Sequence, residues 1–382
     1  MSESKMRRCT CALPQEISDM IFDFLHDDRR TLKSCALVCK PWVHAAHQHL
    51  FYDYRIEATP SFRNGYAMQL HSRAQQSSFY LYIQELTLAA KPSRSSLYPE
   101  LNEDDVAAFF ALLPRLRLLR LEQTGFTRRT PSTQPHAQLA VDTLSINWMY
   151  PSIPGSSSST HDLLSLFREI RELDIRVVHR KHLPDAAHIE RDTPSTITVN
   201  TLTLSDVSGP LLGMLQKMVL GTHLHTIKVA VAATTDVIEL GSLLATVGTN
   251  VVDFQLSIWN FWANDFTDWN VLGLTRCPNL QSVVLLYANS GPLYSWETVY
   301  GLLAAVPATV TKLTIVVRDE YCLNSANWLR LHQGLEHVTS LQHLHFRLCR
   351  GGDLFQSCDI PQKSMDRLRR AFPSLSNRWL KR

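Results

Sequence analysis

The sequence predicts an α/β protein in which a short all-α segment precedes a solenoid with a curved parallel sheet. Three observations lead to this prediction. Helical spacing of apolar residues is concentrated in three short stretches between residues 13 and 51. After them, one apolar pattern recurs ten times at intervals of 25 to 33 residues. Between the recurrences lie apolar stretches suited to helices that would back the strands.

The first predicted helix begins at Pro14, whose missing N–H costs nothing in a first turn, and runs to about Leu25. Its apolar side chains form a stripe, which Phe22 widens to an arc of roughly 200°. One small bundle cannot cover so wide an arc. The stripe itself consists of Ile17, Met20, Ile21, Phe24 and Leu25.

Two further short helices should complete the all-α segment. Asp27 and Asp28 offer side-chain oxygens to cap the second helix, and Pro41 breaks the chain and begins the third. A module of about 40 residues rarely buries enough apolar surface to be stable alone. Two interpretations follow: the helices cap the rest of the chain, or they bind another protein.

The repeated pattern is apolar-x-x-apolar-x-apolar. It begins at residues 83, 116, 141, 170, 199, 224, 251, 280, 310 and 341. Helices are predicted over residues 104–114, 161–168, 210–220 and 296–307. A strand followed by a helix cannot bury its apolar side alone, so neighbouring units should stack into the curved sheet with helices outside.

This pattern resembles a degenerate form of the leucine-rich repeat. The Asn or Cys that this family often places three residues past the strand is represented only by Cys349. A regular ladder in the loops is therefore not implied by the resemblance.

The N-terminal segment resembles an F-box, the motif through which substrate receptors of SCF-type ubiquitin ligases dock on a Skp-family adaptor. Leu13-Pro14-x-Glu16-Ile17 matches the opening of the motif, and Leu37-Val38-Cys39-Lys40-x-Trp42 matches its signature. Pro41 departs from the pattern, because the family more often has Arg or Lys there. The resemblance implies adaptor-binding roles for Leu13, Pro14, Ile17, Ile21, Leu25, Leu37, Val38 and Trp42.

These observations divide the chain into five parts. They are a disordered N-terminus (1–12), the F-box (13–51), a linker with the first repeat helix (52–82), the leucine-rich-repeat-like solenoid (83–364) and a C-terminal cap or basic tail (365–382). Residues 128–136 and 151–160 are rich in Ser, Pro or Gly, which favours mobile loops.

Side-chain alternation along the predicted strands assigns candidate substrate-binding residues to the concave face. Val284, Leu286 and Val316 would form an exposed apolar patch, unless a loop or the C-terminal tail covers them. The aromatic run 258–269 offers Trp259 and Trp262, either as partner contacts or as core residues. The last strand adds His343, His345 and Arg347.

The composition argues against several function classes. With 38 basic and 35 acidic residues, the chain lacks a general field for nucleic acid or acidic membranes. Neither a membrane-spanning apolar run nor a secretory signal is evident, so a cytoplasmic and/or nuclear location and reduced cysteines are expected. The 16 His residues form no constellation for a catalytic or metal site, and the phosphate-binding and nucleophile motifs are missing. No cofactor is expected.

The F-box resemblance implies a non-catalytic, substrate-recognition subunit of a Skp-cullin-F-box ubiquitin ligase. Its partners would be a Skp-family adaptor, through it a cullin, and a protein substrate that the sequence does not identify. Such a receptor acts by raising the local concentration of a target lysine. The alternative is a non-catalytic protein-binding scaffold that acts without the cullin. Nucleic-acid binding through the basic C-terminus is a third hypothesis, with little support from the sequence.

Overall fold

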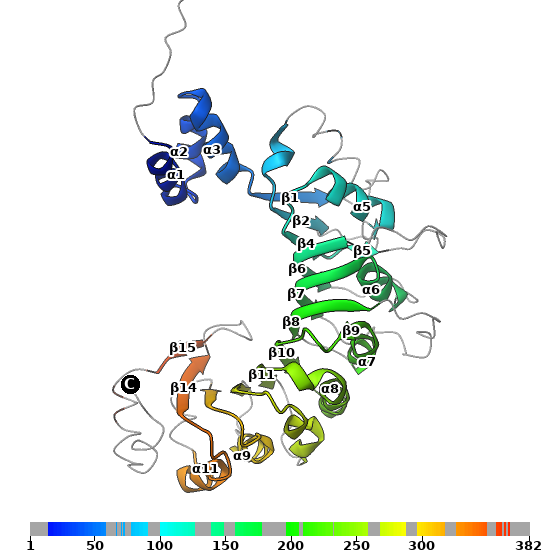
Figure 1. The fold of residues 1–382 in the computed structure, drawn as a ribbon, viewed down its shortest axis with the longest axis vertical. Helices are drawn as coiled ribbons and strands as arrows, with labels where there is room; N and C mark the ends of the chain where they lie inside the picture. Colours follow the sequence, from blue (N-terminus) through cyan, green and yellow to red (C-terminus); the bar gives the residue numbers. More distant parts are fainter. Residues whose placement is uncertain are drawn as a thin grey trace, which may run out of the picture. The chain divides into compact units, whose positions relative to one another are not determined.

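The computed structural model describes residues 14–58, 66, 70, 72, 78–90, 100–126, 139–148, 157–177, 196–205, 209–231, 233–258, 268–287, 296–317, 326–349, 357–360, 363 and 366. The chain divides into two compact units, unit 1 (Met1–Arg129) and unit 2 (Thr130–Arg382). The elements of each unit are labelled in Figure 1.

Unit 1 begins with three short helices, α1 (Gln15–Phe24), α2 (Arg29–Cys35) and α3 (Lys40–Leu50). Their starts have local causes. Pro14 is the N-cap of α1, Asp28 caps α2 by accepting a 3.0 Å hydrogen bond from the Thr31 N–H, and Pro41 lies in the first turn of α3. The three predicted helices are confirmed, and Asp28 is the capping residue of α2.

The rest of unit 1 is built on strands. Strands β1 (Asp53–Ala58), β2 (Glu85–Ala90) and β4 (Leu118–Glu122) pair in parallel in that order. A second, two-stranded sheet pairs β3 (Glu100–Leu101) with β5 (Gly125–Phe126). The described residues of this part also form the 3₁₀ helix η1 (Ser78–Tyr82) and the helix α5 (Glu103–Leu112). The segment predicted as a linker thus contains β1, which extends the sheet by one strand.

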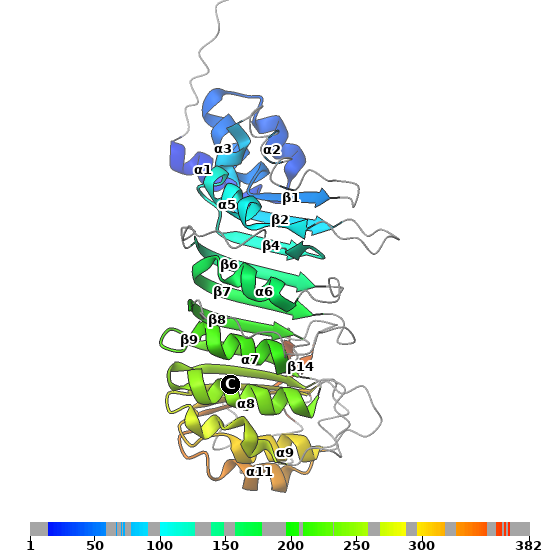
Figure 2. The ribbon, with the colours of Figure 1, turned by 90° about the vertical axis from the view of Figure 1, so that its right-hand side faces the viewer.

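Unit 2 alternates strands with helices, and Figure 2 shows its helices along one face of the sheet. Its strands are β6 (Leu139–Trp148), β7 (Phe167–Val177), β8 (Ile197–Ser205), β9 (Val219–Leu220), β10 (Thr226–Val231), β11 (Asp253–Ile258), β12 (Ser282–Tyr287), β13 (Lys312–Val317), β14 (His343–Cys349) and β15 (Ser357–Asp359). The helices are α6 (Ser157–Leu164), α7 (Gly209–Met218), α8 (Thr234–Val247), η4 (Gly248–Asn250), η5 (Trp269–Leu272), η6 (Leu274–Arg276), α9 (Trp296–Ala305) and α11 (Trp328–Leu335).

The strands of unit 2 follow chain order across the sheet, with β9 beside β8 and off the main path. Pairings from β6 to β14 are parallel, and β15 is added antiparallel at the end. Each of the ten predicted repeat motifs overlaps one of the strands of units 1 and 2. The predicted fold class is therefore confirmed: three N-terminal helices followed by an α/β region with a long parallel sheet.

The register explains why the repeats stack. Equivalent apolar residues of neighbouring strands lie side by side, and each is at most 2% exposed, as for Ile227, Phe254, Val283, Leu313 and Leu344. These side chains form a continuous core between the sheet and the helices. Burial of such a row is the main stabilising contribution, because no single repeat could bury it alone.

Side-chain hydrogen bonds link successive turns just before the strands. The Asn250 amide donates to the Gly221 carbonyl at 3.2 Å, and the Asn279 amide donates to the Thr249 carbonyl at 2.7 Å. One repeat further on, the Thr309 hydroxyl donates to the Leu280 carbonyl at 3.1 Å. These bonds satisfy turn carbonyls that the sheet leaves unpaired. A short polar ladder thus exists at the entry to the strands, where the sequence pattern did not place one.

Other sequence predictions have mixed outcomes. The predicted loop over residues 151–160 is wrong from Ser157 onward, because α6 begins there. The other predicted loop, residues 128–136, lies outside the described residues, as does nearly all of the predicted C-terminal cap. In the described part of the chain, no helix is long and apolar enough to cross a membrane.

Candidate functional site

The three N-terminal helices pack around a small core. Its buried members are Phe22, Leu32, Ala45, Ala46 and Leu50. Only Phe22 comes from α1, and its ring meets the Trp42 indole edge to face, with centroids 5.6 Å apart. This geometry suits two aromatic quadrupoles and fixes α1 against α3. The core is small, so most apolar side chains of α1 have nowhere to be buried.

The apolar stripe of α1 consequently faces outward. Ile17, Met20, Ile21 and Phe24 are 43%, 67%, 40% and 88% exposed, and they recur at the i, i+3, i+4, i+7 spacing of one helix face. In the turn between α2 and α3, Leu37 is 88% exposed and Val38 is 53% exposed. Half of the twelve large apolar side chains that are exposed in the described residues lie in these 22 positions. Exposed apolar patches of this kind are typical of protein-interaction surfaces.

The eight residues predicted to bind an adaptor separate into two groups. Pro14, Ile17, Ile21, Leu37 and Val38 are exposed, and Leu13 lies outside the described residues. Leu25 and Trp42 instead pack against the bundle core. The Trp42 Nε1 is buried and has no hydrogen-bond partner among the described groups. The additional exposed residues are Met20 and Phe24, which share the predicted stripe but are absent from the adaptor-binding set.

An aromatic cluster joins α3 to the strands of unit 1. His44 lies 2.9 Å from the Tyr82 hydroxyl through Nδ1, and the His47 ring packs edge to face on both Phe51 and Tyr82. Phe51 in turn contacts Phe79 of the η1 region, with ring centroids 5.4 Å apart. These contacts hold the helical bundle against the beginning of the sheet inside unit 1.

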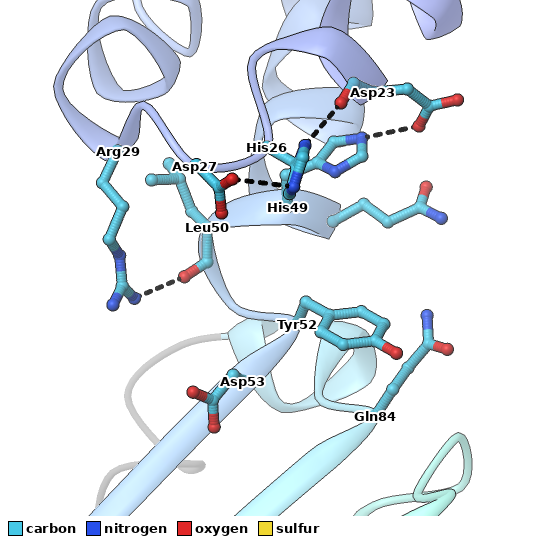
Figure 3. Close-up of a pocket in the computed structure, with 10 residues that line it drawn as sticks. Asp23, His26, Asp27, Arg29, His49, Leu50, Tyr52, Asp53 and Gln84 are labelled. Atoms are coloured by element: carbon cyan, nitrogen blue, oxygen red, sulfur yellow. Dashed lines mark hydrogen bonds and ion pairs between the residues drawn. The ribbon is translucent and has the colours of Figure 1, made fainter. Parts of the chain in front are cut away.

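A polar pocket of about 550 Å³ lies on the other side of this connection, at the ends of α1 and α3. Figure 3 shows the residues that line it. The His49 Nε2 is 3.4 Å from the Asp23 carboxylate, and the Arg29 guanidinium donates to the Leu50 carbonyl at 2.9 Å. Both contacts connect segments that are distant in sequence. Among the described residues that line the pocket, Tyr52 supplies a hydroxyl group, and none is a Ser, Thr or Cys.

Family comparison agrees with this geometry. Residues 10–56 match the F-box-like family. The matched segment spans all three helices and the first part of β1. The chain therefore carries an F-box-like domain at its N-terminus. A search of curated proteins finds no match to the chain.

Outside the F-box-like domain, the predicted apolar patch on the sheet does not form as expected. Leu286 and Val316 are each only 1% exposed, and Val284 is half-buried. The first two therefore belong to the packed interior, because other parts of the fold cover this end of their strands. Trp259 and Trp262 lie outside the described residues, whereas Trp269, at the end of the same aromatic run, is 2% exposed.

The polar residues predicted on the last strand have a different outcome. His343 and His345 are exposed, and Arg347 is half-buried. The two imidazole rings stack with centroids 6.1 Å apart and planes inclined by 21°. Among the described residues, no group of three or more His, Cys, Asp or Glu side chains is arranged to hold a metal ion.

Proposed function

We propose that this protein is a non-catalytic substrate receptor of an SCF-type ubiquitin ligase. In this function, the F-box-like domain docks a Skp-family adaptor, which brings a cullin, and the repeat region binds a protein substrate. The observation that carries the proposal is the exposed apolar surface of the F-box-like domain: Ile17, Met20, Ile21, Phe24, Leu37 and Val38.

The exposure of these side chains favours docking over a merely structural role. If the three helices served only to cap the repeats, the outward stripe of α1 would be buried against the rest of unit 1, as Leu50 is buried in the core of the bundle. Transfer of a large apolar side chain out of water stabilises a complex by about 1.5–3 kcal/mol when burial is complete. Six such side chains supply the apolar centre that stable protein interfaces require.

In the proposed mechanism, the receptor acts by holding two other proteins close together. The receptor forms and breaks no bond itself; it holds a substrate lysine near a conjugating enzyme carried by the cullin arm, which raises the effective concentration of the reacting groups. We place this function in the cytoplasm or nucleus, a reducing environment in which thiols such as Cys35 and Cys277 stay reduced.

Adaptor capture tests the docking surface. Leu37→Asp combined with Val38→Asp should reduce co-purification of a Skp-family adaptor by at least about tenfold, because carboxylates would have to be buried in an apolar interface. The fold should survive, since both side chains already contact water. Circular dichroism would check this. Leu329→Asp is the matched control, because Leu329 is a 67% exposed apolar residue of α11.

The adaptor experiment also separates the two candidate functions. Undiminished adaptor capture by the Leu37→Asp, Val38→Asp variant would contradict the docking proposal. Presence of a cullin in the wild-type complex supports the ligase function, whereas an adaptor complex that never contains a cullin would favour a scaffold.

A further inference from the structure

Four basic or protonatable side chains gather near the end of the sheet in unit 2: Lys312, His343, His345 and Arg347. We call these four residues the basic cluster. They come from β13 and β14. The parallel register places Lys312 opposite His343, Thr314 opposite His345 and Val316 opposite Arg347. Alternate residues of β14 share one face of the sheet, so the two histidines and Arg347 project together. This face is opposite to the one that buries Leu344 and Phe346.

Nearby negative charge does not balance the basic cluster. Lys312 is exposed and forms no ion pair with any described residue. Across the sheet, Lys312 is aligned with Ser282 of β12 and Asp253 of β11. Asp253 has the nearest carboxylate among these aligned residues, and two strand spacings, about 10 Å, separate its backbone from that of Lys312. Asp359 of β15 pairs with Arg347, its Oδ1 lying 3.2 Å from Nε.

The Arg347 contact leaves capacity for a further partner. Its geometry is that of an ion pair without a hydrogen bond, because the buried Nε has no hydrogen-bond acceptor in line among the described residues. Asp359 is 92% exposed, so water screens this pair and its contribution is small. An incoming anion could replace or join Asp359 at little cost.

The electrostatic environment of His345 agrees with this picture. Burial lowers the pKa of His345, and the positive charges of Lys312, His343 and Arg347 lower it further; Asp359 alone acts in the opposite direction. A depressed pKa means that the folded protein resists an additional positive charge at this place. A bound carboxylate would remove that resistance and raise the pKa.

We propose that the basic cluster binds an acidic, Asp- or Glu-rich extended segment of the protein substrate. This inference rests on the proposed function and names the chemistry of what the receptor recognises. The observation that carries it is that Lys312, His343 and His345 are exposed side by side on one face of the sheet, and none of them has a carboxylate of a described residue within ion-pair distance.

The spacing of the cluster matches such a segment. Alternate side chains of an extended chain project to the same side at intervals of about 6.7 Å. The centroids of the His343 and His345 rings are 6.1 Å apart, so carboxylates on alternate residues can meet both rings in turn. Lys312 lies beside His343 on the neighbouring strand and can neutralise the same carboxylate.

The side-chain types favour carboxylates over phosphate groups. Recognition of a phosphate dianion typically uses the two-pronged geometry of a free guanidinium. The basic cluster holds one guanidinium, and its other groups are an ammonium and two imidazoles, which act as single-point donors. Such groups suit singly charged carboxylates.

Peptide binding to the full-length chain without an adaptor tests the inference. The probe is a fluorescein-labelled nonapeptide of alternating Glu and Ser, compared with its Gln-for-Glu version and with a version carrying phosphoserine in place of Glu. We expect the wild type to bind the Glu peptide saturably and not to bind the Gln peptide. The Lys312→Glu variant should bind the Glu peptide at least about tenfold more weakly than the wild type. Lys217→Glu, on the exposed side of α7, is the matched control and should bind like the wild type.

The pH dependence provides a second readout. Burial and neighbouring positive charge lower the pKa of His345, and a bound carboxylate would favour its protonated form, so the Glu peptide should bind more tightly at about pH 5.5 than at about pH 7.5. The Glu side chains of the peptide remain mostly ionised over this range. His343→Gln with His345→Gln should abolish this difference, whereas His223→Gln should keep it.

Several results would overturn the inference: no binding of the Glu peptide, equal binding by Lys312→Glu and the wild type, or binding of the phosphoserine peptide alone. Adaptor capture is measured separately on the same variants. If the wild type captures the adaptor but does not bind the Glu peptide, only the acidic-segment inference is rejected. If the wild type fails to capture the adaptor, the proposed function is rejected.

Discussion

At the scale of single residues, two phenylalanines of α1 show how burial assigns different tasks to the same side chain. Phe22 is 1% exposed and packs on Trp42, whereas Phe24, two positions later, is 88% exposed. Successive residues of a helix are separated by about 100°, so a shift of two positions points a side chain to a different surface. Phe22 therefore stabilises the bundle, and Phe24 is available to a partner.

This contrast leads to a paired prediction. Phe22→Ala should destabilise the three-helix bundle by about 3–5 kcal/mol, because the truncation leaves a cavity beside Trp42. Phe24→Ala should change its stability by less than about 0.5 kcal/mol. Amide hydrogen exchange over residues 15–50 measures both effects. Phe24→Ala should nevertheless weaken adaptor capture. Equal exchange rates in the two variants would show that Phe22 is not the anchor of the core.

Residue-scale reasoning also explains why the predicted apolar patch failed. Alternation along β12 and β13 correctly separates the residues that face the helices, such as Val283 and Leu313, from their neighbours. It does not reveal whether those neighbours are covered. Leu286 and Val316 are buried by contacts outside the strand itself, and contacts of that kind have no periodic signature.

At the scale of elements, the repeats depend on close approach between a helix and the next turn. Gly241 in α8 is the clearest case, because a Cβ at this position would lie 2.1 Å from the Val271 carbonyl oxygen of η5. That atom belongs to the backbone, so a rotamer change cannot relieve the clash. Gly213 in α7 has no atom within 4 Å of the equivalent position.

The two glycines therefore predict opposite responses to the same substitution. Gly241→Ala should lower the free energy of unfolding by about 1–3 kcal/mol, because the helix and the turn must move apart. Gly213→Ala should raise it by about 0.5–1 kcal/mol, because alanine loses less conformational entropy in a helix and has room for its methyl group. Urea unfolding followed by circular dichroism compares them. A stabilising Gly241→Ala would contradict the packing described for α8.

At the scale of the whole molecule, the proposed adaptor and substrate surfaces are formed by different residues of different units. Leu37 and Val38 belong to unit 1, and the basic cluster belongs to unit 2. A substitution in one surface should leave binding at the other unchanged, since sites without shared contacts are usually independent. A substitution in the adaptor surface should consequently stop the degradation of a substrate without stopping its binding.

Proximity labelling in cells tests this separation. Proteins labelled by the wild type should accumulate when the proteasome is inhibited. The Leu37→Asp, Val38→Asp variant should still label the same proteins, and these should accumulate without the inhibitor because no adaptor is bound. Unchanged turnover of the labelled proteins in cells that express only this variant would indicate a scaffold without a degradation role.

Local periodicity was sufficient to predict much of this protein. The three N-terminal helices, ten strands of the parallel sheet and the apolar surplus on α1 all follow from side-chain spacing, because spacing determines which residues of one element share a face. The match of residues 10–56 to the F-box-like family bears out the resemblance seen in the motif.

Only the tertiary structure decided which of those faces remain uncovered. Burial depends on neighbours that are far apart in sequence, so it separated Phe24 from Phe22, placed Leu25 and Trp42 in the bundle core, and covered Leu286 and Val316. The same stacking of distant segments brought Lys312 beside His343 across 31 residues of chain. The interval of 31 residues between the predicted motifs at 310 and 341 already implies that neighbour, whereas the spacing of side chains within a strand does not reveal which distant segments cover a face, because those segments lie elsewhere in the chain.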